Sequence, residues 1–212
     1  MATVPRLLGS RGCGSVIVEC AFALAGLPLE VEEVDYEIGS STRARLLSVN
    51  PLGQVPAMLL PGGQVLTESL AMIQYVQDSA ASAPLIPPLG DPERIEFYHW
   101  AVFLIAAVYP TFTYGDDPVK WVPDPAAAES LKTSTNRHRE TLLLQLEGAA
   151  REPWFLGERI SAIDLYLTAM SHWRPRTAWF NEHAPKIAAL ARRTRELPEL
   201  RAILDAHFPS NA

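Results

Sequence analysis

The stretch QVPAMLLPGGQVLTES, residues 54–69, decides the fold. Two short apolar segments flank the Gly62–Gly63 pair, which predicts a β-hairpin. Pro56 opens the first segment; because it cannot donate to a strand ladder, it belongs at a strand start or a functional bend. The second segment runs into Glu68 and Ser69, where the apolar spacing that follows predicts a helix. Unpaired N–H groups at a helix start attract negative charge, so the hairpin leads into a helix end suited to binding a ligand.

Outward from the hairpin, the apolar patterning predicts two domains. Residues 1–80 read as β-α-β-α-β-β-α, which is typical of a small α/β unit. Residues 81–91 are rich in Pro, Ala and Gly, the composition of a linker. Residues 92–212 lose the strand pattern and keep helical spacing, so an all-helical domain is expected there.

Composition excludes several classes of protein. The 212 residues carry a net charge of −6, which argues against a general nucleic-acid surface. No run of about eighteen apolar residues occurs, and the N-terminus lacks a secretory pattern, so neither a membrane span nor export is expected. The two cysteines, Cys13 and Cys20, lie too close together in one predicted helix to form a secreted disulfide framework. We therefore expect a cytoplasmic protein.

Four motifs together resemble the cytosolic glutathione transferases: NPLGQVP, the TES after the hairpin, the Pro-rich linker and SAIDLYL in the helical half. The resemblance covers essentially the whole chain. It implies a thioredoxin-like N-terminal domain followed by an all-helical C-terminal bundle, and a homodimer. It also implies that the peptide bond before Pro56 is cis, so that the backbone of Val55 can pair with the cysteinyl backbone of glutathione.

The resemblance assigns the remaining glutathione contacts to this sequence by position. Gln54, Val55 and Pro56 lie along the tripeptide, with Gln54 toward its glycine end; the alternative for Gln54 is an exposed loop residue. Glu68 is expected to pair with the γ-glutamyl ammonium, and Ser69 with the neighbouring carboxylate. Without the upstream motif, the alternative for Glu68 and Ser69 is a plain helix cap.

The turn after the first strand departs from the family pattern. Gly26 is a natural residue to end the first helix. Counting back from it places Gly12 where related enzymes carry a working Ser or Cys. Cys13 at the helix mouth, beside Arg11, is the first candidate, since a helix end and a cation both favour a thiolate. Its alternative is a buried apolar residue. Ser15 and Ser10 are the other candidates, as hydrogen-bond donors to the glutathione sulfur. The backbone N–H groups of the turn are a further source of stabilisation.

Two further sets of residues complete the hypothesis. Phe103, Tyr109 and Tyr114 lie on or near the long helix that opens the second half, and are candidates for lining a pocket for a flat apolar electrophile. Ser161 and Asp164 are spaced as a capping box, so we expect them to be structural, not catalytic.

The sequence leaves two functions open. The first is a glutathione-dependent transferase, which activates the glutathione thiol for attack on a small apolar electrophile or for glutathione-linked disulfide reduction, with no metal. The second is a non-catalytic interaction or scaffold protein of the same fold. The acid–hydroxyl pair at residues 68 and 69 favours the first, because a scaffold has no need of that site. A thioredoxin-type reductase is poorly supported, because the chain lacks a CxxC pair.

Overall fold

The computed structural model describes residues 4–37, 39–80 and 83–209. They form two compact units, one from the described parts of 1–86 and 192–212, the other from 87–191. The expected order of a small α/β domain followed by helices is present. The expected helical region of 92–212 does not stay together, because its last helix packs on the first helix of the α/β unit. Positions 81 and 82, where the expected linker begins, lie outside the described residues.

The α/β unit follows the predicted order of elements. Its elements are β1 (Arg6–Gly9), α1 (Ser15–Ala25), β2 (Glu30–Glu33), α2 (Arg43–Val49), β3 (Ala57–Leu59), β4 (Val65–Leu66) and α3 (Ser69–Ser79), joined from the end of the chain by α10 (Pro198–His207). The strands form one sheet in the order β2-β1-β3-β4. β1 is parallel to β2 and antiparallel to β3, and β3 pairs with β4 as the predicted hairpin.

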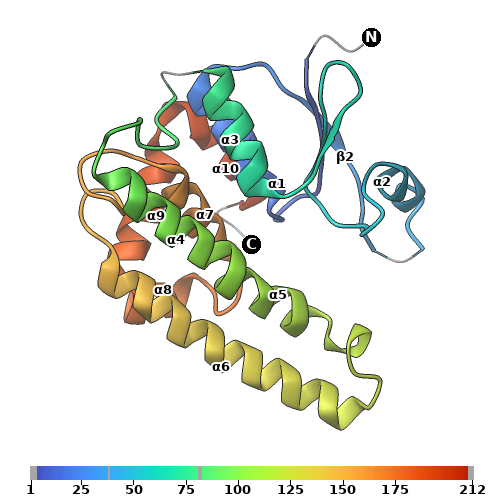
Figure 1. Ribbon diagram of the computed structural model, residues 1–212. Helices are drawn as coiled ribbons and strands as arrows, with labels where there is room; N and C mark the ends of the chain where they lie inside the picture. Colours follow the sequence, from blue (N-terminus) through green and yellow to red (C-terminus); the bar gives the residue numbers. More distant parts are fainter. Residues whose placement is uncertain (1–3, 38, 81–82, 210–212) are drawn as a thin grey trace. The chain divides into compact units, whose positions relative to one another are not determined.

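Helices cover both faces of this sheet because its central strands are apolar on both sides. Leu8 pairs with Ala57 across the sheet and joins a buried cluster with Leu46 of α2. Leu7 and Met58, which alternate with them, are fully buried and so belong to the opposite face. Figure 1 shows α1, α3 and α10 together on one side of the sheet and α2 on the other.

The edge strand β2 is mostly charged, unlike the central strands. Glu30 pairs with Arg6 at 2.9 Å, and Glu32 pairs with Arg45 of α2 at the same distance. Charged side chains on an edge strand discourage pairing with another chain. α1, which connects β1 to this edge, ends at Gly26 in the left-handed conformation, with φ 64°. The sequence predicted this helix end.

The other unit is entirely helical within its described residues. Its elements are α4 (Glu93–Phe103), the π-helix η1 (Leu104–Val108), α5 (Tyr109–Asp116), the 3-10 helix η2 (Pro118–Lys120), α6 (Pro125–Ala149), α7 (Ala162–His172), α8 (Thr177–His183) and the first part of α9 (Pro185–Glu196). The single long helix expected after the linker is thus interrupted by η1. Pro110 supplies the reason: it has no N–H to bond the carbonyl four residues earlier, and a π-turn absorbs that break.

The continuous stretch Glu93–Asp116 is the one helix, among the described residues, that is long and apolar enough to cross a membrane by length and composition. The core helix of a globular protein meets the same criterion. Here the stretch packs against α6 and α7. The buried guanidinium of Arg139 on α6 donates to the Thr111 hydroxyl at 2.9 Å and to the Thr111 carbonyl at 2.7 Å, and burial lowers the pKa of this arginine to about 10. These contacts pack one side of the stretch against the rest of its unit, and about a third of its apolar window is buried.

Candidate active site

The loop that leads into β3 is held from within by Asn50. This buried side chain donates to the carbonyl of Gln54 at 2.9 Å and accepts from the N–H of Leu52 at 3.1 Å. Gln54 itself is exposed and Val55 is half-buried. The Val55–Pro56 peptide bond is cis. The three predicted contact residues 54–56 therefore lie on a loop whose backbone is held by Asn50. The sequence had suggested no role for Asn50.

The second part of the candidate site is the start of α3, where Glu68 precedes Ser69. Glu68 is exposed and has φ 64° and ψ 110°, a conformation that non-glycine residues avoid. Its side chain makes no capping hydrogen bond to the helix, although its carbonyl accepts from the N–H of Met72. Ser69 is buried as the first helical residue. The Glu68 side chain thus does not cap α3, and the strained backbone of this residue is typical of a residue kept for a ligand.

The turn between β1 and α1 is closed by Ser15. Its buried hydroxyl accepts from the Ser10 N–H at 3.2 Å and donates to the Ser10 carbonyl at 3.1 Å. Gly9 makes room for this side chain, because a Cβ at Gly9 would lie 2.8 Å from the Ser15 Cβ. Of the two serines predicted as sulfur donors, Ser15 has a hydroxyl engaged by the turn itself, which points to a structural role.

Cys13 lies two residues before the first residue of α1 and is partly exposed. Its N–H donates to the Ser10 carbonyl and its own carbonyl accepts from Val16. Arg11, expected to supply a positive charge nearby, is exposed and lies 3.4 Å from Glu33 of β2, so part of its charge is offset. Cys20 is buried, and burial together with the charge of Glu19 raises the pKa of its thiol. Of the two thiols, only Cys13 is placed to react.

The predicted capping box at the start of α7 is present. The Asp164 carboxylate accepts from the Ser161 N–H at 2.7 Å, from the Ser161 hydroxyl at 3.0 Å and from the Phe155 N–H at 2.8 Å. Burial raises the pKa of this carboxyl to about 6 in spite of these hydrogen bonds, which lower it. Asp164 is fully buried, so its place in the fold is structural.

The three aromatic residues predicted to line an acceptor pocket belong to three different ring groups. Phe103 packs edge-on against Trp100, with centroids 5.4 Å apart. Tyr109 packs against Trp173 of the α7 end at 5.8 Å, and Tyr114 against Trp121 at 4.8 Å. The helical unit alone therefore does not gather Phe103, Tyr109 and Tyr114 around one space.

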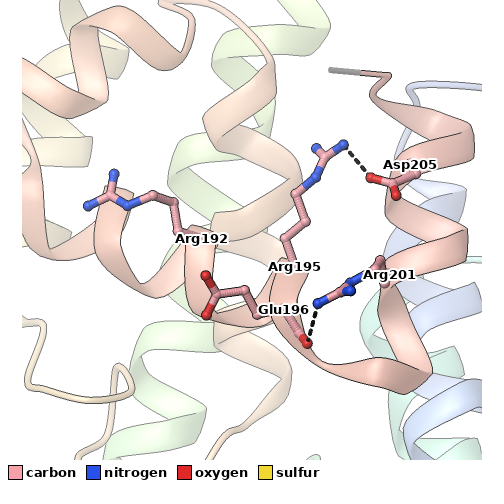
Figure 2. Close-up of a pocket in the computed structure, with 5 residues that line it drawn as sticks. All are labelled: Arg192, Arg195, Glu196, Arg201 and Asp205. Carbon is pink, nitrogen blue, oxygen red and sulfur yellow. Dashed lines mark hydrogen bonds and ion pairs between the residues drawn. The ribbon is translucent and has the colours of Figure 1, made fainter. Parts of the chain in front are cut away.

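A cavity of about 280 Å³ lies elsewhere, between the end of α9 and α10. It is lined by charged side chains, namely Arg192, Arg195, Glu196, Arg201 and Asp205. Figure 2 shows Arg195 reaching across to Asp205, which it contacts at 2.6 Å. None of the predicted site residues lines this cavity; within its lining, Arg201 also donates to the Glu196 carbonyl at 3.4 Å.

Sequence reasoning missed two further side chains near the turn between β1 and α1, those of His207 and of Glu19 in α1. The Gly12 N–H donates to His207 Nδ1 at 3.2 Å, and His207 Nε2 lies 3.1 Å from Glu19 Oε1. His207 belongs to the last helix, 195 residues from Gly12, so no spacing pattern could have found it. Asn50, by contrast, stands in the NPLGQVP motif, and its position before Pro51 was a usable signal.

Comparisons with known proteins agree on one family. The family model described as glutathione S-transferase, N-terminal domain, matches residues 15–79. The uncharacterized GST-like protein YncG of Escherichia coli K12 is 36% identical over 201 residues, which cover 94% of this chain and 96% of that protein. Glutathione S-transferase GstA of Escherichia coli O157:H7 is 32% identical over 160 residues, covering 75% of this chain and 76% of that one.

Solved structures agree with the sequence relatives. A sphingomonad glutathione S-transferase complexed with glutathione superposes with a TM-score of 0.78 at 26% identity, over 95% of this chain and 98% of that one. The similarity extends over nearly the full length of both YncG and the sphingomonad structure. It therefore includes the thioredoxin-like sheet and the helical unit together. The chain belongs to the glutathione S-transferase family.

Proposed function

We propose that this glutathione transferase binds glutathione along the loop before β3 and the start of α3, and that Cys13 is its working group. The observation that carries the binding site is Glu68. It is exposed, it does not cap α3, and it holds a backbone conformation of positive φ that costs about 1–3 kcal/mol. A carboxylate held in this way next to a helix N-terminus suits a ligand that presents an ammonium and a carboxylate side by side, as the γ-glutamyl group does.

The backbone of Val55 is the second support for this assignment. Val55 directly precedes the cis peptide bond to Pro56. It lies at the end of a loop that the Asn50 side chain holds through the Gln54 carbonyl. Val55 lies just before β3 and outside the strands of the sheet, and a backbone in such a place can pair with the peptide of a ligand through main-chain hydrogen bonds. We assign Val55 to the cysteinyl backbone, and Gln54 to the glycine end of the tripeptide.

Cys13 supports thiol–disulfide exchange better than the serines support hydroxyl-assisted conjugation, because the Ser15 hydroxyl is engaged by Ser10. In such an exchange, the Cys13 thiolate attacks the glutathionyl sulfur of a mixed disulfide, joins it and releases the other thiolate. A second glutathione thiolate then attacks the Cys13–glutathione disulfide, giving oxidised glutathione and restoring the Cys13 thiolate. A small apolar electrophile attacked directly by bound glutathione is the other acceptor. No observation favours a non-catalytic scaffold.

The homodimer and the cytoplasmic location are proposals that follow from the family. Apolar side chains exposed on each unit support the dimer: Leu52 is 69% exposed on the loop before β3, and Ile95 and Val102 are 82% and 52% exposed on α4. Ile95 and Val102 are seven residues apart, so they lie on one face of the helix. We propose that Leu52 of one chain packs against this face of α4 in its partner.

Calorimetric titration with glutathione tests the binding site directly, and both conjugation and disulfide-reduction assays on the same preparation then test the chemistry. We expect saturable binding, and reduction of a glutathione mixed disulfide that exceeds conjugation. Absence of binding at millimolar glutathione would overturn the site. If the protein catalyses conjugation but no disulfide reduction, the proposed glutathione-binding site would stand, and the proposed role of Cys13 would be rejected.

A further inference from the structure

The last helix of the chain supplies a side chain to the catalytic turn. His207, at the end of α10, accepts the N–H of Gly12 on Nδ1 at 3.2 Å. Because Nδ1 accepts, the ring proton is on Nε2, which faces Glu19 Oε1 of α1 at 3.1 Å. This second contact is short, but it lacks the alignment of a hydrogen bond. The side chains of His207 and Glu19 are only 8% and 13% exposed, so both interactions are shielded from water.

Gly12 directly precedes Cys13, so the backbone conformation of Gly12 sets the direction in which the Cys13 side chain leaves the turn. Gly12 has φ 72°, and a Cβ there would meet only the His207 carbonyl and the Phe208 ring, both at 3.9 Å. The next N–H, that of Cys13, donates to the Ser10 carbonyl, which also accepts from the Ser15 hydroxyl. The backbone of Gly12 therefore lies between two hydrogen-bonded N–H groups: the N–H of Cys13 is held by Ser10 within the turn, and the N–H of Gly12 is held by His207, 195 residues away.

The end of α10 is itself anchored, which makes His207 a firm support. Arg195 of α9 donates to the carbonyl of Phe208 at 2.6 Å and to the carboxylate of Asp205 at 2.6 Å. These two residues flank His207 in the sequence, and Figure 2 shows the contact to Asp205. A terminal helix turn would ordinarily fray, but here one guanidinium ties it on both sides of the histidine.

We propose that His207 is a positioning residue for the reaction: it holds the Gly12 N–H and thereby aims the Cys13 thiolate at the glutathionyl sulfur of a bound mixed disulfide. This inference rests on the proposed role of Cys13. Gly12 stands where the family resemblance places a working Ser or Cys. The proposal explains why a glycine is possible at this position, because His207 holds the backbone of Gly12 from outside the turn. Loss of the His207 hydrogen bond should lower the reactivity of Cys13 and leave glutathione binding at Glu68 and Val55 intact.

Two substitutions separate the two nitrogens of the ring. In His207→Asn the side-chain oxygen can take the place of Nδ1 and keep the Gly12 bond. In His207→Gln the amide reaches the place of Nε2 and leaves Gly12 without its acceptor. Each is compared with wild type in three measurements: the rate of iodoacetamide alkylation at Cys13 located by mass spectrometry, the kcat for mixed-disulfide reduction, and the Kd for glutathione. His138→Gln, on the exposed surface of α6, is the matched control.

We expect His207→Gln to lower both the alkylation rate and kcat by about five- to tenfold, the equivalent of one hydrogen bond, with Kd within about twofold of wild type. His207→Asn should restore most of both rates. The amide of Gly12 should be protected from hydrogen exchange in wild type and His207→Asn, and exposed in His207→Gln. If His207→Gln does not fold, hydrogen exchange of the Gly12 amide in wild type still tests the proposal. An unprotected Gly12 amide in wild type would overturn it.

Equal rates in His207→Asn and His207→Gln would overturn it as well, and so would a loss of glutathione affinity that matches the loss of rate. Failure of the proposed function gives a different result. If Cys13→Ala keeps full turnover, Cys13 is not the working group, yet the alkylation rates in the two His207 variants still report whether His207 aims that thiol.

Discussion

The hydroxyl of Ser15 is hydrogen-bonded to both backbone groups of Ser10, accepting from its N–H at 3.2 Å and donating to its carbonyl at 3.1 Å. Two such bonds to one residue close the turn between β1 and α1. They engage the hydroxyl that we had considered as a hydrogen-bond donor to the glutathione sulfur. A buried side chain engaged in this way serves the shape of the turn, which supports our proposal that Cys13 is the reactive group.

Ser15→Ala should therefore cost stability before it costs chemistry. Removing the hydroxyl takes away the acceptor of the partly buried Ser10 N–H and one of the two donors to the Ser10 carbonyl, at about 1–3 kcal/mol in the free energy of unfolding. For a chain of this length that corresponds to a fall of roughly 2–10 °C in Tm. Thermal unfolding and steady-state kinetics on one preparation check this. Unchanged Tm with a strongly reduced kcat would make Ser15 a sulfur donor after all.

Cys13→Ser should abolish disulfide reduction and leave the Kd for glutathione within about twofold, because Glu68 and Val55 supply the binding. The Cys13 thiol should also react with iodoacetamide at a pH well below the roughly 8.5 of an ordinary cysteine, since it lies at a helix N-terminus. Cys20→Ala serves as the control, because Cys20 is buried. If Cys13 alkylates only near its ordinary pKa and Cys13→Ser is fully active, Ser10 and Ser15 return as candidates, and Ser10→Ala and Ser15→Ala test them.

Glu68 allows binding and backbone strain to be separated. Glu68→Gly and Glu68→Gln should both weaken glutathione affinity by about 1.5–3 kcal/mol, roughly ten- to hundredfold in Kd. Glycine accepts the positive φ that Glu68 holds, so Glu68→Gly should also raise the free energy of unfolding by about 1 kcal/mol, whereas Glu68→Gln should not. Calorimetry and urea unfolding measure the two effects. Affinity unchanged in Glu68→Gln would remove Glu68 from the site.

Leu52→Lys should weaken the proposed homodimer, because it places a charge where an exposed apolar side chain would pack against α4 of the partner. We expect wild type to sediment as a dimer at micromolar concentration, and Leu52→Lys to shift toward monomer. Leu89→Lys is the matched control, being an equally apolar and 88% exposed residue outside the loop. A wild-type chain that sediments only as a monomer would contradict the dimer itself.

Asp164→Ala should be the most destabilising of these changes. It removes the acceptor of the buried Phe155 and Ser161 N–H groups, which should cost about 2–5 kcal/mol without any direct effect on glutathione binding. Thermal unfolding in the presence and absence of glutathione separates the two. A change of less than about 1 kcal/mol would show that water or a neighbour replaces the carboxylate.

The same residue predicts a pH dependence. The carboxyl pKa is raised in the folded state to about 6, from about 3.9 in an unfolded chain. The contribution of this group to stability is therefore fully present below about pH 3.9 and is lost as the pH rises through about 6. Asp164→Asn cannot titrate, so the stability difference between wild type and Asp164→Asn should shrink from pH 4 to pH 7. A difference that grows over this range would contradict the raised pKa.

Local patterns account for what was predictable in the fold. The alternation around Gly62–Gly63 predicted the hairpin, Gly26 predicted the end of α1, and the spacing of Ser161 and Asp164 predicted the start of α7. Each signal lies within a few residues of the feature it specifies. The interruption of the long helix at η1 was not predicted, although Pro110 was visible, because a proline can end a helix, kink it or be absorbed by a π-turn depending on its packing.

The sequence by itself determined the order of elements and the family, because short-range periodicity and contiguous motifs encode both, and the same motifs supplied the residues that we propose for glutathione. Only the tertiary structure decided how the turn between β1 and α1 is held. Ser15 was a candidate sulfur donor until its hydroxyl was seen on the backbone of Ser10. His207 had no signal at all, since a hydrogen bond to a residue 195 positions away arises from the packing of α10 on α1 and leaves no pattern along the chain.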